Sequence, residues 1–345
     1  MRTKHQIILD DARSMIHLKD ESVDLMITSP PYPMIQMWDE MFGEQNPEIT
    51  KALKEEDGEK AFELMHKELD KVWSETFRVL KNGGIACINI GDATRTLKDV
   101  FQIYTNHARI LNHCLKLGFH ALPEILWIKE TNKPDKFMGS GMLPVGAYVT
   151  LEHEHILILR KDGKRKFIKT EQKANRQKSA FFWEERNLWF SDKWRDINGV
   201  FQKLNNTKLR ERSAAYPIEL AYRLINMFSV QGDIVLDPFL GTGTTTLAAL
   251  SSARNSIGYE IDKNFKDLIE ERIKEIKDIA NERSEQRINS HLEFIKVKFS
   301  EGGEKYTNKT YNFPIVTSQE TNLAIPKLKE VVVVENNLFE AEHFY

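Results

Sequence analysis

A serine followed by two prolines and a tyrosine is the first group of residues whose types and order could do chemistry. The segment Thr28-Ser29-Pro30-Pro31-Tyr32 comes directly after the apolar run VDLMIT. Each proline ring fixes its own φ angle and restricts the preceding residue, so the turn is rigid. Such a turn can aim the Ser29 hydroxyl and the Pro30 carbonyl in one direction. The alternative is an ordinary Pro-Pro turn beside a core tyrosine.

A glycine-rich loop is the second such group. The segment DPFLGTGT, residues 237–244, lies between the apolar run DIVL and a helical pattern. Its glycines let the backbone pass close to a ligand, and the helix N-terminus beyond them offers unpaired N–H groups. It is not a P-loop, and Thr246 stands where a full GxGxxG would have its third glycine. Glu260, at the end of the next predicted strand, either binds both hydroxyls of a ribose or is a surface carboxylate.

The order of these two groups resembles that of the amino-methyltransferases of DNA, in the circularly permuted arrangement where the catalytic motif comes first. TSPPY is similar to that family's Ser/Asp-Pro-Pro-Tyr signature, in the variant typical of N4-cytosine enzymes of restriction–modification systems. DPFLGTGTT resembles the family's cofactor loop, and LKNGG (80–84) with Gly91-Asp92 resembles another block. RSAAYP (212–217) resembles a block that normally reads His-Pro-Ala-x-Phe-Pro, and Ser213 stands where that histidine would be.

The resemblance implies S-adenosylmethionine as the cofactor and no metal. It also implies two sets of site residues. The expected catalytic residues are Ser29, Pro30, Pro31 and Tyr32. The expected cofactor-binding residues are Asp11, Ser213, Tyr216, Pro217, Asp237, Pro238, Phe239, Gly241, Gly243, Thr244 and Glu260.

The expected reaction is methylation of an exocyclic amino group, with N4 of cytosine favoured by the serine. The lone pair of such an amine is delocalised into the ring, so the nitrogen is a poor nucleophile. Ser29 Oγ and the Pro30 carbonyl can accept its two N–H hydrogens and point its lone pair at the methyl donor. Positioning and electrostatics then supply most of the acceleration. We expect Tyr32 to stack on the base, which must first be flipped out of the duplex.

Other reactions compete with this interpretation. Adenine N6 presents the same chemistry, although Asp in place of Ser29 is commoner there. Cytosine-C5 methylation is disfavoured because it needs a Pro-Cys nucleophile, whereas Ala86 precedes Cys87 and His113 precedes Cys114. An RNA, protein or small-molecule methyltransferase would leave the basic region described below unexplained. A non-catalytic DNA-binding module would have no need for both motifs.

The elements that must position these residues alternate between short apolar runs and helical patterns. Such alternation predicts an α/β fold with a doubly wound, mostly parallel sheet, and the resemblance implies seven Rossmann-like strands. Met34–Phe42 lines the pocket, forms a mobile flap or begins a packed amphipathic helix. The expected strands are Gln6–Leu9, Val23–Thr28, Ile85–Ile90, Pro123–Ile128, His155–Arg160, Ile234–Leu236, Ser256–Glu260 and, in the tail, HLEFIKVKF and KEVVVVE. The expected helices are Glu59–Leu80 (ended by Gly83-Gly84), Asp99–Leu117 (ended by Gly118), Pro217–Phe228, Thr244–Ala253 and Asn264–Arg287.

The segment from Arg160 to Arg212 interrupts this alternation. It contains 16 Lys and Arg against 7 Asp and Glu, although the whole chain has a net charge of −2. A basic region with interleaved tryptophans is what contact with the phosphates of double-stranded DNA requires; a solvated lysine-rich loop is the alternative. The candidate DNA-binding residues are Lys164, Arg165, Lys166, Arg176, Lys178, Arg186, Lys193 and Arg195.

These patterns divide the chain into four expected parts. They are a catalytic half (1–160), a target-recognition region (161–212), a cofactor-binding half (213–290) and a strand-rich extension (291–345). Two cysteines suggest no disulfide framework or zinc site. No apolar run reaches the roughly 20 residues that span a bilayer, so we expect a cytoplasmic protein. A restriction endonuclease acting on the same site is a partner that the resemblance makes plausible, while the sequence leaves the oligomeric state open.

Overall fold

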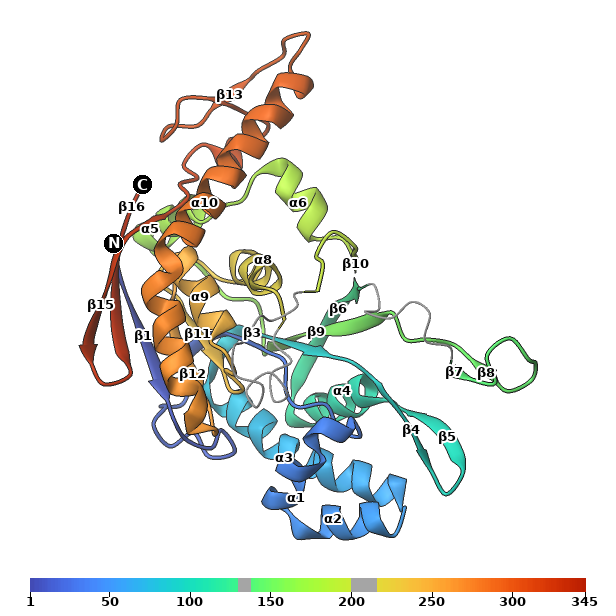
Figure 1. Cartoon of the computed structure of the whole chain (residues 1–345). Helices are drawn as coiled ribbons and strands as arrows, with labels where there is room; N and C mark the ends of the chain where they lie inside the picture. The colour runs from blue at the N-terminus through green and yellow to red at the C-terminus, as the bar shows by residue number, and fades with distance from the viewer. Residues whose placement is uncertain (130–137, 200–215) are drawn as a thin grey trace.

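A ten-stranded sheet forms the centre of the computed structural model, which describes residues 1–129, 138–199 and 216–345 (Figure 1). The strand order is β10-β6-β9-β3-β2-β11-β12-β1-β16-β15. These strands are β1 (Arg2–Ile8), β2 (Val23–Thr28), β3 (Leu80–Ile90), β6 (Phe119–Ile128), β9 (His153–Lys161), β10 (Lys193–Trp194), β11 (Ile234–Asp237), β12 (Asn255–Tyr259), β15 (Lys327–Glu335) and β16 (Leu338–Phe344).

The inner part of the sheet is parallel. Strands β3, β2, β11, β12 and β1 pair in parallel, and β9 runs antiparallel between β3 and β6. Every residue of β2 is buried, as expected for a parallel strand that is covered on both faces. The doubly wound α/β prediction is therefore confirmed. The seven strands from β6 to β1 form its core, and β10, β16 and β15 extend it at the two edges.

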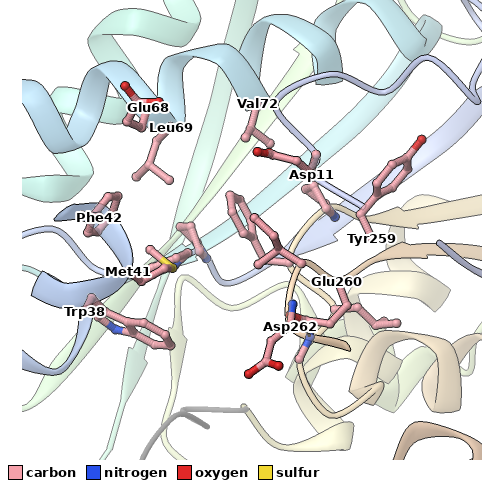
Figure 2. A pocket seen from close by; sticks show the side chains of 18 of the residues that line it. Asp11, Trp38, Met41, Phe42, Glu68, Leu69, Val72, Tyr259, Glu260 and Asp262 are labelled. Carbon is pink, nitrogen blue, oxygen red and sulfur yellow. Dashed lines mark hydrogen bonds between the residues drawn. The ribbon is translucent and has the colours of Figure 1, made fainter. Parts of the chain in front are cut away.

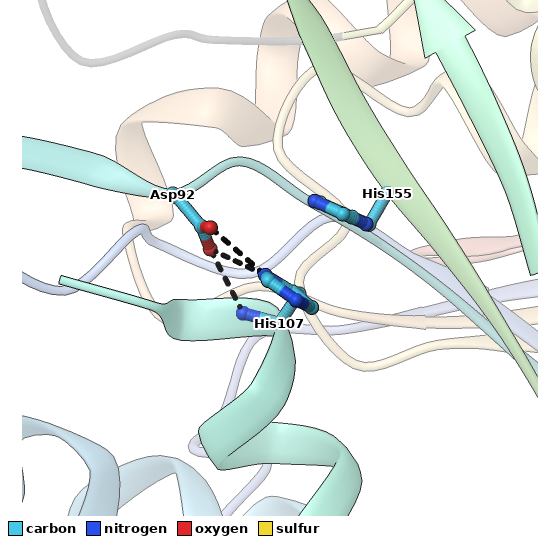
Figure 3. Close-up of side chains that lie close together, drawn as sticks. All are labelled: Asp92, His107 and His155. Carbon is cyan, nitrogen blue, oxygen red and sulfur yellow. Dashed lines mark hydrogen bonds and ion pairs between the residues drawn. The ribbon is translucent and has the colours of Figure 1, made fainter. Parts of the chain in front are cut away.

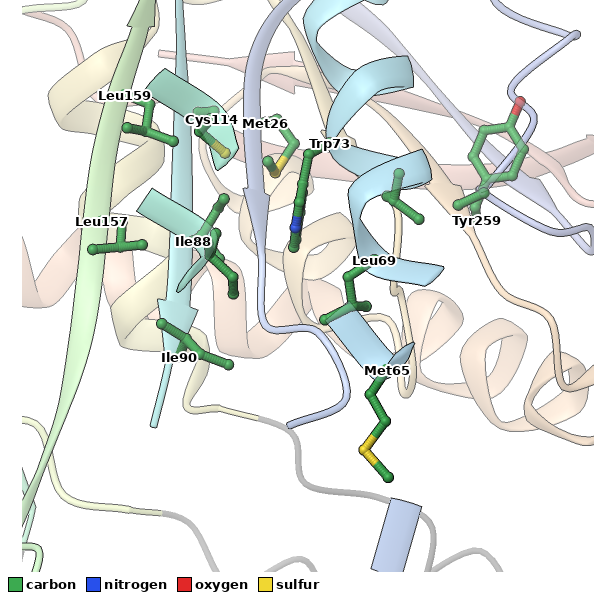
Figure 4. Close-up of a cluster of buried hydrophobic side chains, with 14 of the residues drawn as sticks. Met26, Met65, Leu69, Trp73, Ile88, Ile90, Cys114, Leu157, Leu159 and Tyr259 are labelled. Atoms are coloured by element: carbon green, nitrogen blue, oxygen red, sulfur yellow. The ribbon is translucent and has the colours of Figure 1, made fainter. Parts of the chain in front are cut away.

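Helices cover both faces of the sheet. One face packs against α3 (Gly58–Val79) and α4 (Asn106–Leu117), where Trp73, Ile88 and Leu157 are buried together (Figure 4). The other face carries α8 (Ile218–Phe228), α9 (Thr244–Ser251) and α10 (Lys266–Lys298). The remaining helices are α1 (Asp39–Gln45), α2 (Pro47–Lys54), α5 (Thr170–Lys178), α6 (Trp183–Trp189) and the short 3-10 turns η1 (Gln36–Trp38), η2 (Lys263–Phe265) and η3 (Ser318–Glu320). No helix in the described parts of the chain is long and apolar enough to cross a membrane.

The predicted helix Asp99–Leu117 was wrong in its first part. A hairpin of β4 (Ala93–Leu97) and β5 (Val100–Tyr104) occupies that stretch, and the helix begins only at Asn106. Lys98 and Asp99 both have positive φ angles, 48° and 59°, which suits a two-residue hairpin turn between strands rich in β-branched and aromatic residues. At the other end Gly118 adopts φ 108° and ends α4 as predicted. Gly83 and Gly84, by contrast, lie within β3 rather than ending α3.

The tail prediction was half right. KEVVVVE lies in β15, which pairs with β16, and β16 pairs antiparallel with β1. HLEFIKVKF is helical instead, because α10 continues to Lys298 and crosses the expected boundary at residue 290. The alternation of apolar residues that suggested a strand also places His291 and Ile295 one helical turn apart. Both are buried, and Ile295 packs with Phe182 and Phe313. Two-residue strands β7 (Met138–Gly139), β8 (Ala147–Tyr148), β13 (Tyr306–Thr307) and β14 (Pro314–Ile315) complete the structure.

Candidate active site

A cavity of about 670 Å³ opens where the parallel strands end, which we call the carboxyl edge of the sheet. Segments that follow β1, β2, β11 and β12 line it, as expected for a ligand site in a doubly wound sheet. Trp38, Met41 and Phe42 lie on one side, and Asp11 and Glu260 on the other (Figure 2). The predicted residues that line the cavity are Asp11, Ser29, Pro30, Pro31, Tyr32, Tyr216, Pro238, Phe239, Gly241, Thr244 and Glu260.

Ser29 and Tyr32 belong to a network of polar side chains that reaches two neighbouring strands. Ser29 Oγ lies 3.1 Å from Tyr32 Oη, and Tyr32 donates to Glu154 Oε2 of β9 at 2.9 Å. Asn89 of β3 donates to Tyr32 Oη at 3.0 Å and to Glu154 Oε2 at 2.7 Å. Lys129 forms an ion pair with the other oxygen of Glu154. Burial, followed by the charge of Glu154, raises the pKa of Tyr32 well above its ordinary value.

Sequence reasoning missed Asn89 and Glu154. Their signal was present, because each is a polar residue in or next to an apolar run, INI in β3 and HILIL in β9. Both are buried, and a buried polar side chain calls for a hydrogen-bond partner. A second signal is Gly91: a Cβ there would lie 2.9 Å from Tyr32 Cε2, so the tyrosine ring needs glycine at this position.

Asp237 joins the turn that follows β2 to the glycine-rich loop, and it does not itself line the cavity. Its Oδ1 accepts the Thr28 hydroxyl at 2.6 Å and the backbone N–H of Phe239 at 3.0 Å. Its Oδ2 accepts the hydroxyls of Thr245 and Tyr216. Burial raises the pKa of Asp237, although these four donors all act to lower it. The carboxylate therefore works as a structural connector between two loops.

The glycine-rich loop needs its glycines for backbone reasons. Gly241 and Gly243 have φ angles of 53° and 86°, a region that side chains disfavour, and Gly243 directly precedes α9. A Cβ on Gly258 of β12 would lie 2.5 Å from Leu240 Cδ2, so the loop packs directly on that strand. From the other side, Arg272 of α10 donates to the carbonyl and the hydroxyl of Thr242.

Glu260 is the most perturbed carboxylate that lines the cavity. Its two oxygens accept the backbone N–H groups of Gly241 at 2.7 Å and of Asp262 at 2.8 Å. Burial raises its pKa to about 7 despite these hydrogen bonds. Each oxygen still has a lone pair available, so the group can accept hydroxyl hydrogens from a ligand.

The remaining predicted cofactor residues occupy different positions. Asp11 lines the cavity, and Arg13 holds its carboxylate while also bonding Glu68. Pro217 precedes α8 and does not line the cavity, and Ser213 lies outside the described residues. Met34–Phe42 meets both interpretations, since its 3-10 turn leads into α1 and several of its side chains line the cavity.

A family model described as "DNA methylase" matches residues 23–271. The chain belongs to this DNA methylase family. It is 53% identical over 341 residues to the type II methyltransferase M.MthZI of Methanothermobacter thermautotrophicus, covering 99% of this chain and 95% of that one. It is 52% identical over 282 residues to the type II methyltransferase M.MjaI of Methanocaldococcus jannaschii, covering 79% and 91%. Among solved structures it is similar to TTHA0409, a putative DNA modification methylase of Thermus thermophilus in complex with S-adenosylmethionine. That similarity has a TM-score of 0.61 and 33% identity, and covers 79% of this chain and 95% of that one.

Within residues 160–199, the basic side chains of the methylase lie at more than one edge of the sheet. Arg165 bonds Asp233 at 2.6 and 2.9 Å, and Asp233 precedes β11 at the opposite, amino edge of the sheet. Helix α5 lies at that edge too, because Asn175 donates to the carbonyl of Gln231. Arg165 and α5 therefore lie at the edge of the sheet opposite the cavity, and DNA contact by Lys164, Arg165, Lys166, Arg176 and Lys178 stays a prediction.

The other three basic candidates lie elsewhere. Arg186 is exposed on α6, with its guanidinium over the Phe190 ring. Lys193 and Arg195 are exposed on either side of Trp194 in β10, which pairs with the last residues of β6 at the carboxyl edge. Lys193 and Arg195 thus share an edge with the cavity.

A cluster at the carboxyl edge was not predicted from sequence. Asp92 accepts hydrogen bonds from the backbone N–H and Nδ1 of His107, and the ring of His155 stacks on that of His107 at 3.8 Å (Figure 3). The hydrogen bond with Asp92 raises the pKa of His107, whereas burial, followed by the charge of His107, lowers the pKa of His155. A metal ion would need the nitrogen lone pairs of His107 and His155 to point at one place. The two ring planes are nearly parallel, at 11°, so these in-plane lone pairs do not converge. The cluster is therefore an ion pair with a stacked ring.

Proposed function

We propose that this methylase transfers the methyl group of S-adenosylmethionine to N4 of a cytosine within a specific DNA sequence. The observation that carries the proposal is the Ser29 hydroxyl on the wall of the cavity, next to the rigid Pro30-Pro31 turn. A neutral hydroxyl and a carbonyl are two acceptors that match the two N–H hydrogens of an amino group. The similarity to type II methyltransferases supports the site-specific part of the proposal.

The cavity fits the cofactor chemically. Glu260 offers carboxylate oxygens to a ribose, and the Phe239, Val72 and Leu69 side chains offer an apolar wall to a flat ring. We assign the ribose to Glu260 and the adenine to the side of Asp11. The methionine carboxylate goes to the side of Tyr216, with Ser213 a further candidate. When bound, S-adenosylmethionine supplies an electrophilic methyl group.

The residues of the chain position the nucleophile. Ser29 Oγ and the Pro30 carbonyl accept the two amino hydrogens, which holds the nitrogen closer to tetrahedral and frees its lone pair. The apolar segment with Trp38 and Met41 excludes water from the cavity and strengthens these hydrogen bonds. Tyr32 lines the same wall, and its proposed stacking on the base is compatible with a hydroxyl that points into the buried network.

DNA must approach the carboxyl edge, because the cavity opens there. The target cytosine is flipped out of the duplex, at a cost of a few kcal/mol. Lys193 and Arg195 are the predicted basic residues that we retain as phosphate contacts. We also propose a restriction endonuclease of the same specificity as a functional partner, on the strength of the type II relatives.

Methylation of the cytosine ring carbon is not part of the proposal. Cys87 and Cys114 are both buried, and burial raises the pKa of each thiol far above its ordinary value. Neither can supply the thiolate that attack on the ring requires.

The test is mass spectrometry of nucleosides from unmethylated genomic DNA that has been incubated with the protein and S-adenosylmethionine. We expect N4-methylcytosine. We also expect Ser29→Ala to lower the methylation rate by on the order of 10²-fold, as for loss of one transition-state hydrogen bond, while DNA binding persists. N6-methyladenine as the product would overturn the inference from serine and keep the family chemistry.

A further inference from the structure

We infer that Ser29, Tyr32 and Glu154 form a proton relay that carries a proton away from the amino group as it is methylated. The inference rests on the proposed role of Ser29 as an acceptor for that amino group. Glu154 lies on β9, outside every motif that the sequence singles out, and acts through Tyr32 rather than on the base. It is therefore a positioning residue at the end of a chain of hydrogen bonds.

The hydrogens in the network can be assigned from the donors and acceptors that meet there. An ionised Glu154 only accepts, so the single hydroxyl hydrogen of Tyr32 points to Glu154 Oε2, 2.9 Å away. The two amide hydrogens of Asn89 go to its two nearest acceptors, Glu154 Oε2 at 2.7 Å and Tyr32 Oη at 3.0 Å, while Ser29 Oγ is farther away at 3.4 Å. Because the hydrogen of Tyr32 is directed to Glu154, the contact of 3.1 Å between Ser29 Oγ and Tyr32 Oη requires Ser29 as the donor. This direction leaves the lone pairs of Ser29 available to the amino group.

Asn89 fixes the direction of the chain. Its Oδ1 is buried and has no hydrogen-bond partner in the described structure. Turning the amide over would give Oδ1 other surroundings but would set an acceptor against the Glu154 carboxylate. The structure leaves this oxygen unpaired, which is costly, and keeps both N–H groups on the relay.

Glu154 is suited to be the end of the relay. Only 7% of the residue is exposed, and a buried carboxylate needs a charged or hydrogen-bonding partner. Lys129 supplies that partner at Oε1, which leaves Oε2 for Tyr32 and Asn89. The side chain of Lys129 is 38% exposed, so the far end of the ion pair reaches solvent.

The step balances along this chain. As the nitrogen gains its fourth bond, one N–H bond breaks and its proton moves to Ser29 Oγ. The hydroxyl proton of Ser29 moves to Tyr32 Oη, and the proton of Tyr32 moves to Glu154 Oε2. The net change is a neutral methylated amine and a protonated Glu154, which afterwards returns its proton to water. Every intermediate oxygen ends with one hydrogen, as it began.

The experiment measures single-turnover methylation of unmethylated genomic DNA in H2O and in D2O. For the wild type we expect slower transfer in D2O. For Glu154→Gln, which has a similar shape but takes up no proton, we expect a rate lower by on the order of 10²-fold, the low end of general acid–base contributions. We also expect this variant to lose the solvent isotope effect while its KM for DNA stays unchanged.

The matched control is Asp24→Asn. Asp24 is also a buried carboxylate paired with a lysine, Lys81 at 2.8 Å, but it lies at the amino edge of the sheet. We expect it to affect stability and leave rate and isotope effect as in the wild type. If Glu154→Gln does not fold, Tyr32→Phe interrupts the same chain with the ring retained, and the same two losses are expected.

Two results would overturn the relay. One is a Glu154→Gln protein as fast as the wild type, and the other is a slow variant that keeps the wild-type isotope effect, which would mean orientation only. Failure of the proposed function has a different appearance. Full turnover by Ser29→Ala would contradict the site itself, and N6-methyladenine as the product would change the base and leave the relay intact.

Discussion

Single residues on the cavity wall can carry a charge that burial disfavours. Glu260 illustrates this, because its carboxylate is buried on the cavity wall and burial raises its pKa to about 7. In the unfolded chain the same group ionises near its ordinary value of 4.5. The ligand-free protein therefore holds a charge at neutral pH that the fold disfavours, and a ribose with two hydroxyls would offset that cost.

Replacing Glu260 by Gln should separate these two effects. Because the folded pKa is raised, the wild type loses stability as pH rises from about 4.5 to about 7. With about 1.4 kcal/mol per pKa unit, the loss is about 3 kcal/mol at most, and Glu260→Gln should not show it. The variant should also bind S-adenosylmethionine about 10- to 10²-fold more weakly, since hydrogen bonds to a charged group contribute about 1.5–3 kcal/mol.

The pH dependence of stability is measured by thermal unfolding between pH 4.5 and 8. The cofactor affinity is measured by calorimetric titration. Glu75→Gln is a suitable control, because hydrogen bonds from Arg78 lower the pKa of that carboxyl, so its pH dependence has the opposite sign. An unchanged pH slope in Glu260→Gln would show that the buried carboxylate does not ionise as inferred.

At the scale of elements, the sequence predicted what local patterns determine and missed what distant packing determines. The strand VDLMIT and the stop of α4 at Gly118 follow from burial on both faces and from a left-handed glycine. HLEFIKVKF could not be assigned from its own residues, because its alternation fits a strand as well as a helix. Phe182 and Phe313, which pack with it, lie far away in the sequence.

The site divides in the same way. The turn with Ser29 and the glycine-rich loop were predictable, because each combines a local constraint with a strand end. Glu154 and Asn89 were not, since only the order of strands in the sheet brings β9 and β3 beside Ser29. The position of the basic residues could not be predicted for a related reason: charge in the sequence does not tell which edge of a sheet a loop crosses, and Arg165 lies at the amino edge.

The contact between α6 and the end of α10 should depend on pH. His291 Nδ1 faces Glu184 at 2.8 Å and Nε2 faces the Pro314 carbonyl at 3.1 Å, and both partners only accept. Both ring nitrogens must therefore carry hydrogens. Burial alone would lower the pKa of His291, but the interactions with Glu184 and Pro314 outweigh it and raise the pKa above 6.5.

The sign follows from the raised pKa. The stabilisation of the fold by protonated His291 is complete below pH 6.5 and is lost as pH rises through the pKa of His291 in the folded protein. Deprotonation leaves one buried acceptor unpaired, which costs about 1–3 kcal/mol. Hydrogen exchange at the end of α10 should therefore speed up with pH beyond its intrinsic rate, and His291→Gln should lack that extra increase. An equal increase in both proteins would contradict the imidazolium assignment.

At the scale of the whole molecule, one continuous open sheet carries both the Ser29 turn after β2 and the glycine-rich loop after β11, and the two chain ends meet within it. The amino group of Met1 donates to the His343 carbonyl at 2.8 Å, and β16 lies along β1 (Figure 1). Both loops are anchored in the same sheet, because β2 pairs with β11. The hydrogen bond between Thr28 and Asp237 connects the end of β2 to the end of β11, from which the two loops start.

That bond has a thermodynamic consequence. If cofactor binding at the glycine-rich loop raises the affinity for a flipped base through Asp237, then a bound base must raise the affinity for the cofactor by the same factor. The two affinities form a closed thermodynamic cycle, and we expect the buried Thr28 hydroxyl to carry the coupling between the ligands. Cofactor titrations with and without DNA measure the coupling as the ratio of the cofactor Kd without DNA to the Kd with DNA, and we expect this ratio to exceed one. Thr28→Val should bring the ratio toward one, because it weakens only the complex of protein, cofactor and DNA. A valine variant with the wild-type ratio would mean that the two ligands communicate by another route.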